Sequence, residues 1–406
     1  MIGRSSALAL STLLLAVAAC NRSHASPPQA ARPPQASAPP ATPSVLAAVR
    51  PRPAPCLPRA SATPAALADR AGTELDRGDP ARALACADEA LRAAPRLRAA
   101  LLARADALTA LDRTADARLA WARALAADPD DAEALVGAAD LYVTRLGGDR
   151  QSLELGLEYA LRGASSALRA ADRDLAATAL VLSATAENDL GMPEDALGHA
   201  DAALGQRAGD VDALYERGVA LYELCRFADA RAALEAVLAH APKDAWAMHE
   251  LALVAERTGD GPRAAGLERR ARELAPGEFP APVEMDRSDF EGEVRRALAA
   301  LPDPERKALA SVPVEVEDVP ALDDLVAVDP PLSPSILGLY RGPPEGEACL
   351  PEDGPRCRSI VVYRQNLARF ARNRDELSEQ VRVTLLHELG HLHGETDDDL
   401  RARGLE

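Results

Sequence analysis

Large aliphatic residues recur along the middle of the chain with a period of 34 positions. One such series keeps this spacing on either side of a single longer step: Leu67, Leu101 and Leu135, then Leu180, Leu214 and Met248. Prolines follow the same period: Pro95 and Pro129, then Pro242 and Pro276. The longer step is 45 residues, which is 34 plus 11. A fixed period of this length indicates stacked helical hairpins. We therefore predict about six units, with an insertion in the third, at 132–176.

The repeated units resemble tetratricopeptide repeats over residues 64–277. Trp121 and Gly218 lie where that family places a bulky aromatic residue and a small residue. The resemblance implies an α-solenoid whose concave surface binds a polypeptide segment. A spacer, or an internal scaffold for the C-terminal region, is the alternative role of such repeats.

After residue 277 the pattern changes to a mixture of strands and helices. Alternating apolar residues and short apolar runs predict strands at 312–316, 336–340 and 359–363. Helices are expected at 287–300 and 374–393, the second capped by Asn373. Its apolar stripe can anchor that helix to a core: Leu377, Val381, Leu385 and Leu392. The chain is therefore predicted to be mainly α, an α-solenoid followed by a small α+β domain.

The last predicted helix carries the sequence His387-Glu388-Leu389-Gly390-His391. Residues four apart lie on one face of a helix, so the two imidazoles are about 6 Å apart. Two ligands of one Zn²⁺ ion need this arrangement. Glu388 follows the first histidine and is placed to act as general base toward an attacking water.

A third metal ligand is expected ten residues after His387. Gly394 lets the chain leave the helix and return a side chain to the metal, which points to Asp397. The neighbouring Asp398 and Asp399 are expected to form a solvated acidic turn. Metzincins place a methionine turn below their metal, and no Met follows this motif. That subclass is therefore excluded.

The last 120 or so residues resemble small bacterial minimal zincin metallopeptidases with the pattern HExxHxxGxxD. The resemblance rests on blocks in a fixed order: Phe290-Glu291, Val314 to Asp318, Gly338 to Gly342, Ile360 to Arg364, Val381 to Thr384 and the metal motif. It implies one zinc ion held by His387, His391 and Asp397, with Glu388 as base. One departure is Leu392-His393, since relatives often have a histidine directly after the second ligand, where this chain has Leu392. A purely structural zinc site, or a metal-binding but inactive domain, remains the alternative.

The first twenty residues have the features of a secretory signal. An apolar stretch of 12 residues, 7–18, is too short to span a bilayer, which takes about 20. The following Val17-Ala18-Ala19-Cys20 resembles the lipobox of bacterial lipoproteins, in which the cysteine is lipidated. Asn21 follows, and the absence of Asp there favours the outer membrane, facing the periplasm. An ordinary signal-cleavage site is the alternative.

The next segment has the composition of a spacer. Residues 27–64 contain 12 prolines in 38 positions, which favours extended conformations and cannot build a core. The predicted organisation is a lipoprotein signal at 1–20, a disordered Pro/Ala-rich linker at 21–63, repeats at 64–277 and a zincin-like domain at 278–406.

Charge and cysteine content add two constraints. The net charge is −17 with 3% aromatic residues, which argues against a nucleic-acid partner. Export permits a disulfide, and Cys349 and Cys357 flank one short loop, so we predict that they pair, with a second metal site as the alternative. The sequence offers no partner for the other three cysteines outside the signal: Cys56, Cys86 and Cys225.

Together these features predict a zinc-dependent peptidase of the cell envelope that is anchored to the membrane by lipid. The repeats are expected to recruit a polypeptide substrate or partner, and the strand at 359–363 to pair with substrate along its edge. The alternative function is a catalytically inactive envelope lipoprotein in which the repeats act as an interaction adaptor.

Overall fold

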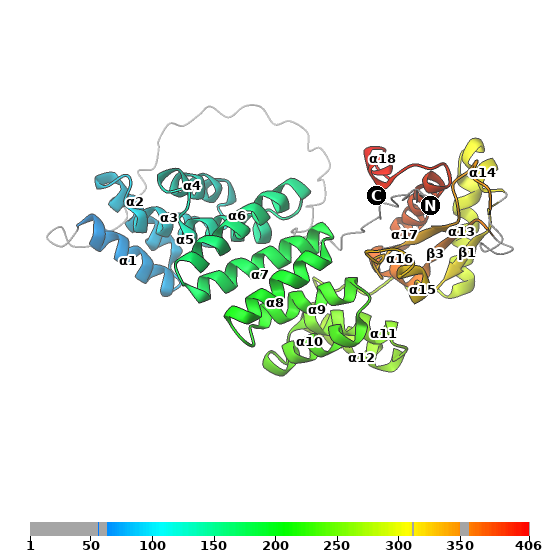
Figure 1. Cartoon of the computed structure of the whole chain (residues 1–406), viewed down its shortest axis with the longest axis horizontal. Helices are drawn as coiled ribbons and strands as arrows, with labels where there is room; N and C mark the ends of the chain where they lie inside the picture. The colour runs from blue at the N-terminus through cyan, green and yellow to red at the C-terminus, as the bar shows by residue number, and fades with distance from the viewer. Residues whose placement is uncertain (1–55, 57–62, 311, 350–356, 406) are drawn as a thin grey trace, which may run out of the picture. The chain divides into compact units, whose positions relative to one another are not determined.

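The computed structural model describes residues 56, 63–310, 312–349 and 357–405 (Figure 1). The predicted signal with Cys20, and most of the linker at 21–63, lie outside this range. Two compact units divide the chain, one ending with helix α7 and one containing α9 and all later elements. The residues of α8 (Pro193–Gln206) are shared between them. Among the described residues, no helix is both long and apolar enough to cross a membrane.

The first unit consists of antiparallel helix pairs. Its elements are α1 (Pro64–Asp76), α2 (Pro80–Ala93), α3 (Arg98–Ala110), α4 (Thr114–Ala127), α5 (Ala132–Asp140), the π-helical turn η2 (Leu141–Arg145), α6 (Arg150–Arg169) and α7 (Arg173–Leu190). The α-solenoid expected from the period of 34 is thus present. The predicted insertion lies in η2 and in α6, which has 20 residues where α2 and α4 have 14.

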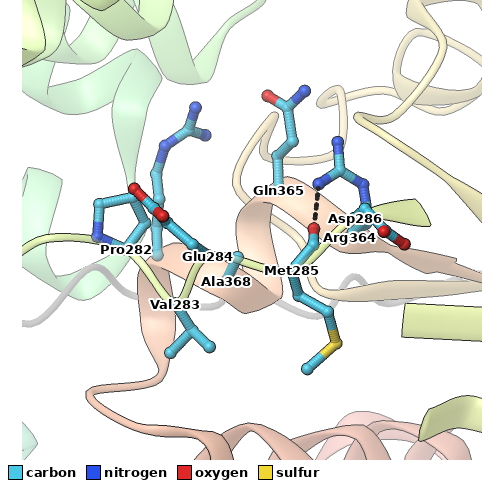
Figure 2. Close-up of a pocket in the computed structure, with 9 residues that line it drawn as sticks. Pro282, Val283, Glu284, Met285, Asp286, Arg364, Gln365 and Ala368 are labelled. Atoms are coloured by element: carbon cyan, nitrogen blue, oxygen red, sulfur yellow. Dashed lines mark hydrogen bonds between the residues drawn. The ribbon is translucent and has the colours of Figure 1, made fainter. Parts of the chain in front are cut away.

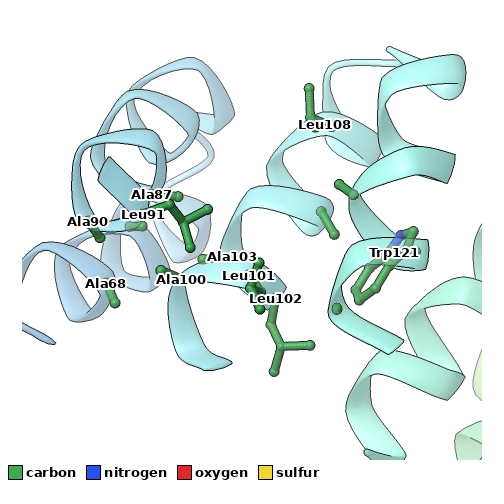
Figure 3. Close-up of a cluster of buried hydrophobic side chains, with 14 of the residues drawn as sticks. Ala68, Ala87, Ala90, Leu91, Ala100, Leu101, Leu102, Ala103, Leu108 and Trp121 are labelled. Atoms are coloured by element: carbon green, nitrogen blue, oxygen red, sulfur yellow. The ribbon is translucent and has the colours of Figure 1, made fainter. Parts of the chain in front are cut away.

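Small residues let these helices pack closely. The core of the first pairs consists mostly of alanine and leucine side chains, with Trp121 as its large aromatic residue (Figure 3). A Cβ added to Gly137 on α5 would lie 2.2 Å from the Trp121 ring. The glycine therefore provides the space that the tryptophan fills, which is the large-against-small packing expected of such repeats.

Polar contacts cap the helices and link neighbouring helix pairs. Aspartate side chains cap several N-termini: Asp79, Asp131, Asp149, Asp210, Asp244 and Asp260. Asp131 also accepts hydrogen bonds of 2.5 and 2.7 Å from Arg98, which joins the starts of α5 and α3. The structure pairs Cys56 with Cys86 of α2, a disulfide that could not be predicted from the sequence.

The second unit begins with the last two helix pairs and ends with the α+β domain. The repeat helices are α9 (Val211–Glu223), α10 (Phe227–His240), α11 (Ala245–Arg257) and α12 (Gly261–Leu274). The domain consists of α13 (Arg287–Ala300), α14 (Asp303–Leu309), β1 (Val314–Glu317), α15 (Leu322–Leu325), β2 (Gly338–Arg341), β3 (Ser359–Tyr363), α16 (Arg364–Phe370), α17 (Arg374–Leu392) and α18 (Asp397–Ala402).

The three strands form one sheet in the order β1-β3-β2. β1 is parallel to β3, and β2 is antiparallel to it with Gly338 opposite Val362. The predicted strand at 359–363 is therefore central, with a partner on each side. The expectation that this strand pairs with substrate along its edge is wrong, because both of its edges are already hydrogen-bonded. Among the described residues, β1 and β2 are the edge strands of the sheet.

The side chains of β3 alternate between two cores. Ile360 and Val362 face α13 and α17, and Val361 and Tyr363 face Leu325 of α15. The predicted apolar stripe of α17 lies in the first of these cores and is almost fully buried. This packing holds α17 against the sheet, so the face of α17 opposite the apolar stripe points away from this core.

The last repeats contact the α+β domain directly. Glu256 at the end of α11 pairs with Arg369 of α16. The side chain of Arg257 donates to the Pro320 carbonyl, and Cys225 Sγ lies 3.7 Å from the Leu332 carbonyl oxygen. These contacts hold the end of the solenoid and the domain together as parts of one compact unit.

Candidate metal centre

Helix α17 positions the three motif side chains. Its start is fixed by Asn373, whose side chain accepts a 2.9 Å hydrogen bond from the Glu376 N–H. His387, Glu388 and His391 then follow in its last two turns. The apolar stripe faces the sheet, so the two histidines point away from that core, with side chains 15% and 24% exposed.

The two imidazoles and one carboxylate converge on a common point. The Nε2 atoms of His387 and His391 are 3.1 Å apart. Asp397 Oδ1 lies 3.4 Å from the first and 3.2 Å from the second. In the described part of the chain, these three residues form a group of metal-ligating side chains whose atoms all lie within 4.8 Å of one another.

Backbone carbonyls determine which nitrogen of each imidazole faces this point. His387 Nδ1 donates to the Leu405 carbonyl at 2.7 Å, and His391 Nδ1 donates to the Glu395 carbonyl at 3.0 Å. A carbonyl oxygen only accepts, so both protons lie on Nδ1. In the neutral rings the two Nε2 lone pairs then point at each other, an arrangement that needs a cation or a proton between them.

Asp397 reaches this point because the chain turns sharply after α17. Gly394 has φ of 82°, in the left-handed region that glycine adopts without strain. Asp397 is then the first residue of α18 and is buried, and neither of its carboxylate oxygens has a hydrogen-bond partner. The acidic segment expected to be a turn is thus a short helix. Asp399 forms a capping box with Thr396, and Asp398 pairs with Arg401.

The arrangement fits a zinc ion. Tetrahedral coordination at 2.0–2.1 Å places ligand atoms about 3.3 Å apart, close to the three separations seen here. A buried carboxylate without a hydrogen-bond donor is costly unless a cation compensates it. Two imidazoles and one carboxylate are also a donor set typical of catalytic zinc, which keeps a fourth position open. His387, His391 and Asp397 are the residues that would hold the ion.

Without a metal the three groups already interact electrostatically. Burial lowers the pKa values of His387 and His391, but the neighbouring Asp397 and Glu388 outweigh it, so both values are raised. Burial raises the pKa of Asp397, but the two imidazoles lower it by more, so that the pKa falls to about 2. The metal-free centre thus favours charged imidazoles, which must release protons when zinc binds.

Glu388 lies next to the first histidine in the chain, and its side chain packs against strand β2. It is buried, and burial raises its pKa although the imidazoles and the Tyr340 N–H, which donates to its carboxylate, oppose the shift. A Cβ added to Gly338 would lie 2.9 Å from Glu388 Oε1 and 2.6 Å from the Thr384 methyl carbon. The glycine therefore allows β2 to approach the carboxylate closely.

The loop after β2 packs against the end of α17. The structure joins Cys349 to Cys357 by a disulfide. The Glu345 N–H donates to the Leu392 carbonyl at 2.6 Å, and the Glu345 carboxylate lies 3.2 Å from His393 Nδ1. His393 is thus an exposed residue at the helix end, away from the group of three ligands.

A cavity of about 460 Å³ lies elsewhere in the domain, between the segment Pro282–Asp286 and α16 (Figure 2). Arg364 spans its wall and donates to the Met285 carbonyl at 3.1 Å. Its lining includes neither the three ligands nor Glu388. The candidate metal centre therefore lies outside this cavity.

Sequence reasoning named the four side chains but missed the groups that orient them. The Leu405, Glu395 and Tyr340 contacts are made by backbone atoms, which carry no residue-specific signal. Gly338 and Gly390 could have been singled out, because a glycine inside a strand or helix indicates close approach of another element.

Comparisons with known proteins agree with this description. Residues 309–405 match the family model of the zincin-like metallopeptidases, and residues 69–132 and 215–279 match the tetratricopeptide repeat. No curated protein matches the chain.

Several solved structures are similar to the chain. The type IV pilus biogenesis factor PilW is 17% identical, with a TM-score of 0.46, over 52% of this chain and 94% of that one. PilF of Pseudomonas aeruginosa is 17% identical, with a TM-score of 0.46, over 57% and 97%. YrrB, a tetratricopeptide protein with an unusual peptide-binding site, is 18% identical, with a TM-score of 0.37, over 47% and 92%. The family matches show that the chain carries tetratricopeptide repeats followed by a zincin-like metallopeptidase domain.

Proposed function

We propose that the protein is an exported zinc-dependent peptidase that hydrolyses peptide bonds in a polypeptide recruited by its repeats. One observation carries the proposal: two imidazole lone pairs and the unpartnered Asp397 carboxylate meet at one point, and the buried Glu388 interacts electrostatically with all three groups. A structural zinc site has no need of a buried carboxylate that is not a ligand. Glu388 therefore favours a catalytic role.

The residues of the chain divide the work of hydrolysis. Bound zinc supplies Lewis acidity toward the scissile carbonyl and lowers the pKa of a water molecule. Glu388 takes the proton of the attacking water and returns it to the leaving amine. The Tyr340 N–H holds the carboxylate in place, and burial raises its pKa, which favours uptake of the proton.

The free edge of β2 is the surface we propose for the substrate backbone. The Tyr363 N–H donates to the Leu337 carbonyl at 2.9 Å, and paired residues alternate along an antiparallel ladder. Leu339 then also bonds to β3, while the backbone groups of Gly338 and Tyr340 point away from it. Because the Tyr340 N–H donates to Glu388, the Gly338 groups and the Tyr340 carbonyl are the ones proposed to pair with substrate. An extended peptide that paired with this edge would pass beside Glu388.

Export and lipid anchoring at Cys20 are part of the proposal. The two disulfides, Cys56–Cys86 and Cys349–Cys357, support an oxidising compartment such as the bacterial periplasm. We propose a lipid anchor in the outer membrane facing the periplasm, with the linker at 21–63 as a spacer. Cys20→Ser should move the protein from the membrane fraction to the soluble fraction; equal membrane association of both forms would contradict the anchor.

The peptidase is tested by Glu388→Gln. The variant keeps all three ligands, so its zinc content should stay at one ion per chain while hydrolysis of an unfolded protein substrate falls by about 10² or more. Unchanged hydrolysis would rule out this mechanism. If the wild-type protein binds zinc but cleaves no unfolded substrate, the inactive adaptor becomes the better description.

A further inference from the structure

The segment 395–405 touches the metal centre at three separate points. The Glu395 carbonyl accepts from His391 Nδ1, and the Leu405 carbonyl accepts from His387 Nδ1. Between these two carbonyls the segment supplies the Asp397 carboxylate itself. One short segment thus provides one ligand and orients the other two.

The side chain of Leu400 packs this segment against α17. Leu400, in α18, is completely buried and packs over Gly390, which lies between the two histidines on α17. A Cβ at position 390 would lie 2.2 Å from Leu400 Cδ2 and 2.8 Å from Glu395 Oε2. An alanine there would force the Leu400 side chain to move, and because that side chain is completely buried, the packing of α18 against the helix has to absorb the movement. Glycine inside a helix is less favourable than alanine, so this position gives up helix stability for close approach.

Leu400 is also joined to both ends of the segment. Its N–H donates to the Thr396 carbonyl at 3.0 Å, next to Asp397. Its carbonyl accepts from the Leu405 N–H at 3.0 Å. A displacement of Leu400 would therefore be transmitted to the Asp397 carboxylate on one side and to the Leu405 carbonyl on the other.

We propose that the contact between Gly390 and Leu400 sets the geometry of the metal centre. The two are positioning residues, which act on the ion through Asp397, Glu395 and Leu405. The inference rests on the metal site of the proposed function but not on its peptidase activity. Groups that orient metal ligands typically change metal affinity by 10- to 100-fold when they are lost.

The test is the zinc affinity of the full chain, measured by competition with a chromophoric chelator. Gly390→Ala should weaken binding at least tenfold, because the added methyl group displaces α18. Leu400→Ala should also weaken it, because it unpacks the segment without creating a clash. In the Leu400→Ala background, adding Gly390→Ala should cost less than threefold, since the Leu400 atoms are gone and only the partly exposed Glu395 carboxylate still has to move.

Two further variants make the result specific. Gly292→Ala is the matched control: it is also a helical glycine of this domain, but its added Cβ would meet only the ends of arginine side chains at 3.6 Å or more, so affinity should not change. His387→Ala should abolish tight binding. Unchanged affinity in Gly390→Ala, or an equal loss with and without Leu400, would overturn the inference while His387→Ala still upholds the site. If His387→Ala binds zinc normally, both the inference and the proposed site fail. Should Gly390→Ala not fold, normal zinc affinity in Leu400→Ala overturns the inference by itself.

Discussion

Buried carboxylates in the repeats and in the α+β domain differ in their hydrogen-bond partners. In the repeats, Asp131 accepts two hydrogen bonds from Arg98 and two from backbone N–H groups. In the domain, Asp397 is equally buried but has no hydrogen-bond donor. A buried carboxylate with its own partners stabilises the fold, whereas one without them indicates a cation that completes the site.

The two regions also use glycine differently. Gly137 in the repeats makes room for a tryptophan ring, so its effect is on packing. Gly338 and Gly390 in the domain let a strand and a helix approach the metal centre, so their effect is on the position of functional groups. The same residue type therefore reports on stability in one region and on chemistry in the other.

The largest effect expected in the repeats is that of Asp131→Ala. The variant loses a helix cap and a charged hydrogen-bonded pair, which together stabilise the fold by about 2–3 kcal/mol. Urea unfolding followed by circular dichroism measures the loss, and zinc content should not change. Asp88→Ala is the control, since its pair with Arg104 is half exposed and contributes about 0.2–1 kcal/mol. Equal losses in both variants would mean that burial does not separate the two carboxylates.

A smaller effect is expected from Gly137→Ala. The added methyl group meets the Trp121 ring, and overpacking of this kind costs about 1–3 kcal/mol. Gly72→Ala in α1 is the matched control, because its Cβ would meet nothing within 4 Å. It should stabilise the repeats by about 0.5–1 kcal/mol. Unfolding midpoints that shift in the same direction would contradict the packing account.

The smallest effect, counted for one proton and one pH unit, is expected in the pH dependence of the zinc affinity. The pKa values of His387 and His391 are raised in the metal-free protein, and zinc needs both rings neutral. Affinity should therefore be constant at high pH and fall as the pH drops through these raised values, by about tenfold per pH unit for each proton taken up. Chelator competition between pH 5 and 9 measures it. An affinity that stays flat down to pH 5 would show that the imidazoles are not ligands.

Much of the fold follows from local patterns in the sequence. The period of 34 predicts the helix pairs because each pair repeats the same packing, and Asn373 with the apolar stripe predicts α17. The order of the strands could not be predicted, because β3 reads as a short apolar run whether it is central or at an edge. Its partners are chosen by contacts far apart in the sequence.

In the candidate site, the three ligands could be predicted from the sequence, but the helix that carries Asp397 could not. Spacing on one helix brings His387 and His391 together, and Gly394 returns Asp397 to them. Helix α18 was missed because three successive aspartates read as a solvated turn. Its cap at Thr396 and its burial of Leu400 depend on contact with α17, which no local pattern records.

The central claim is that Asp397, of three adjacent aspartates, completes a zinc site. Metal analysis of purified Asp397→Asn, Asp398→Asn and Asp399→Asn tests it most directly. We expect one zinc ion per chain in the wild type and in the variants at 398 and 399, whose carboxylates pair with Arg401 and Thr396. Asp397→Asn should lose most of its zinc and its activity. A larger loss of zinc at position 398 or 399 than at 397 would contradict the account.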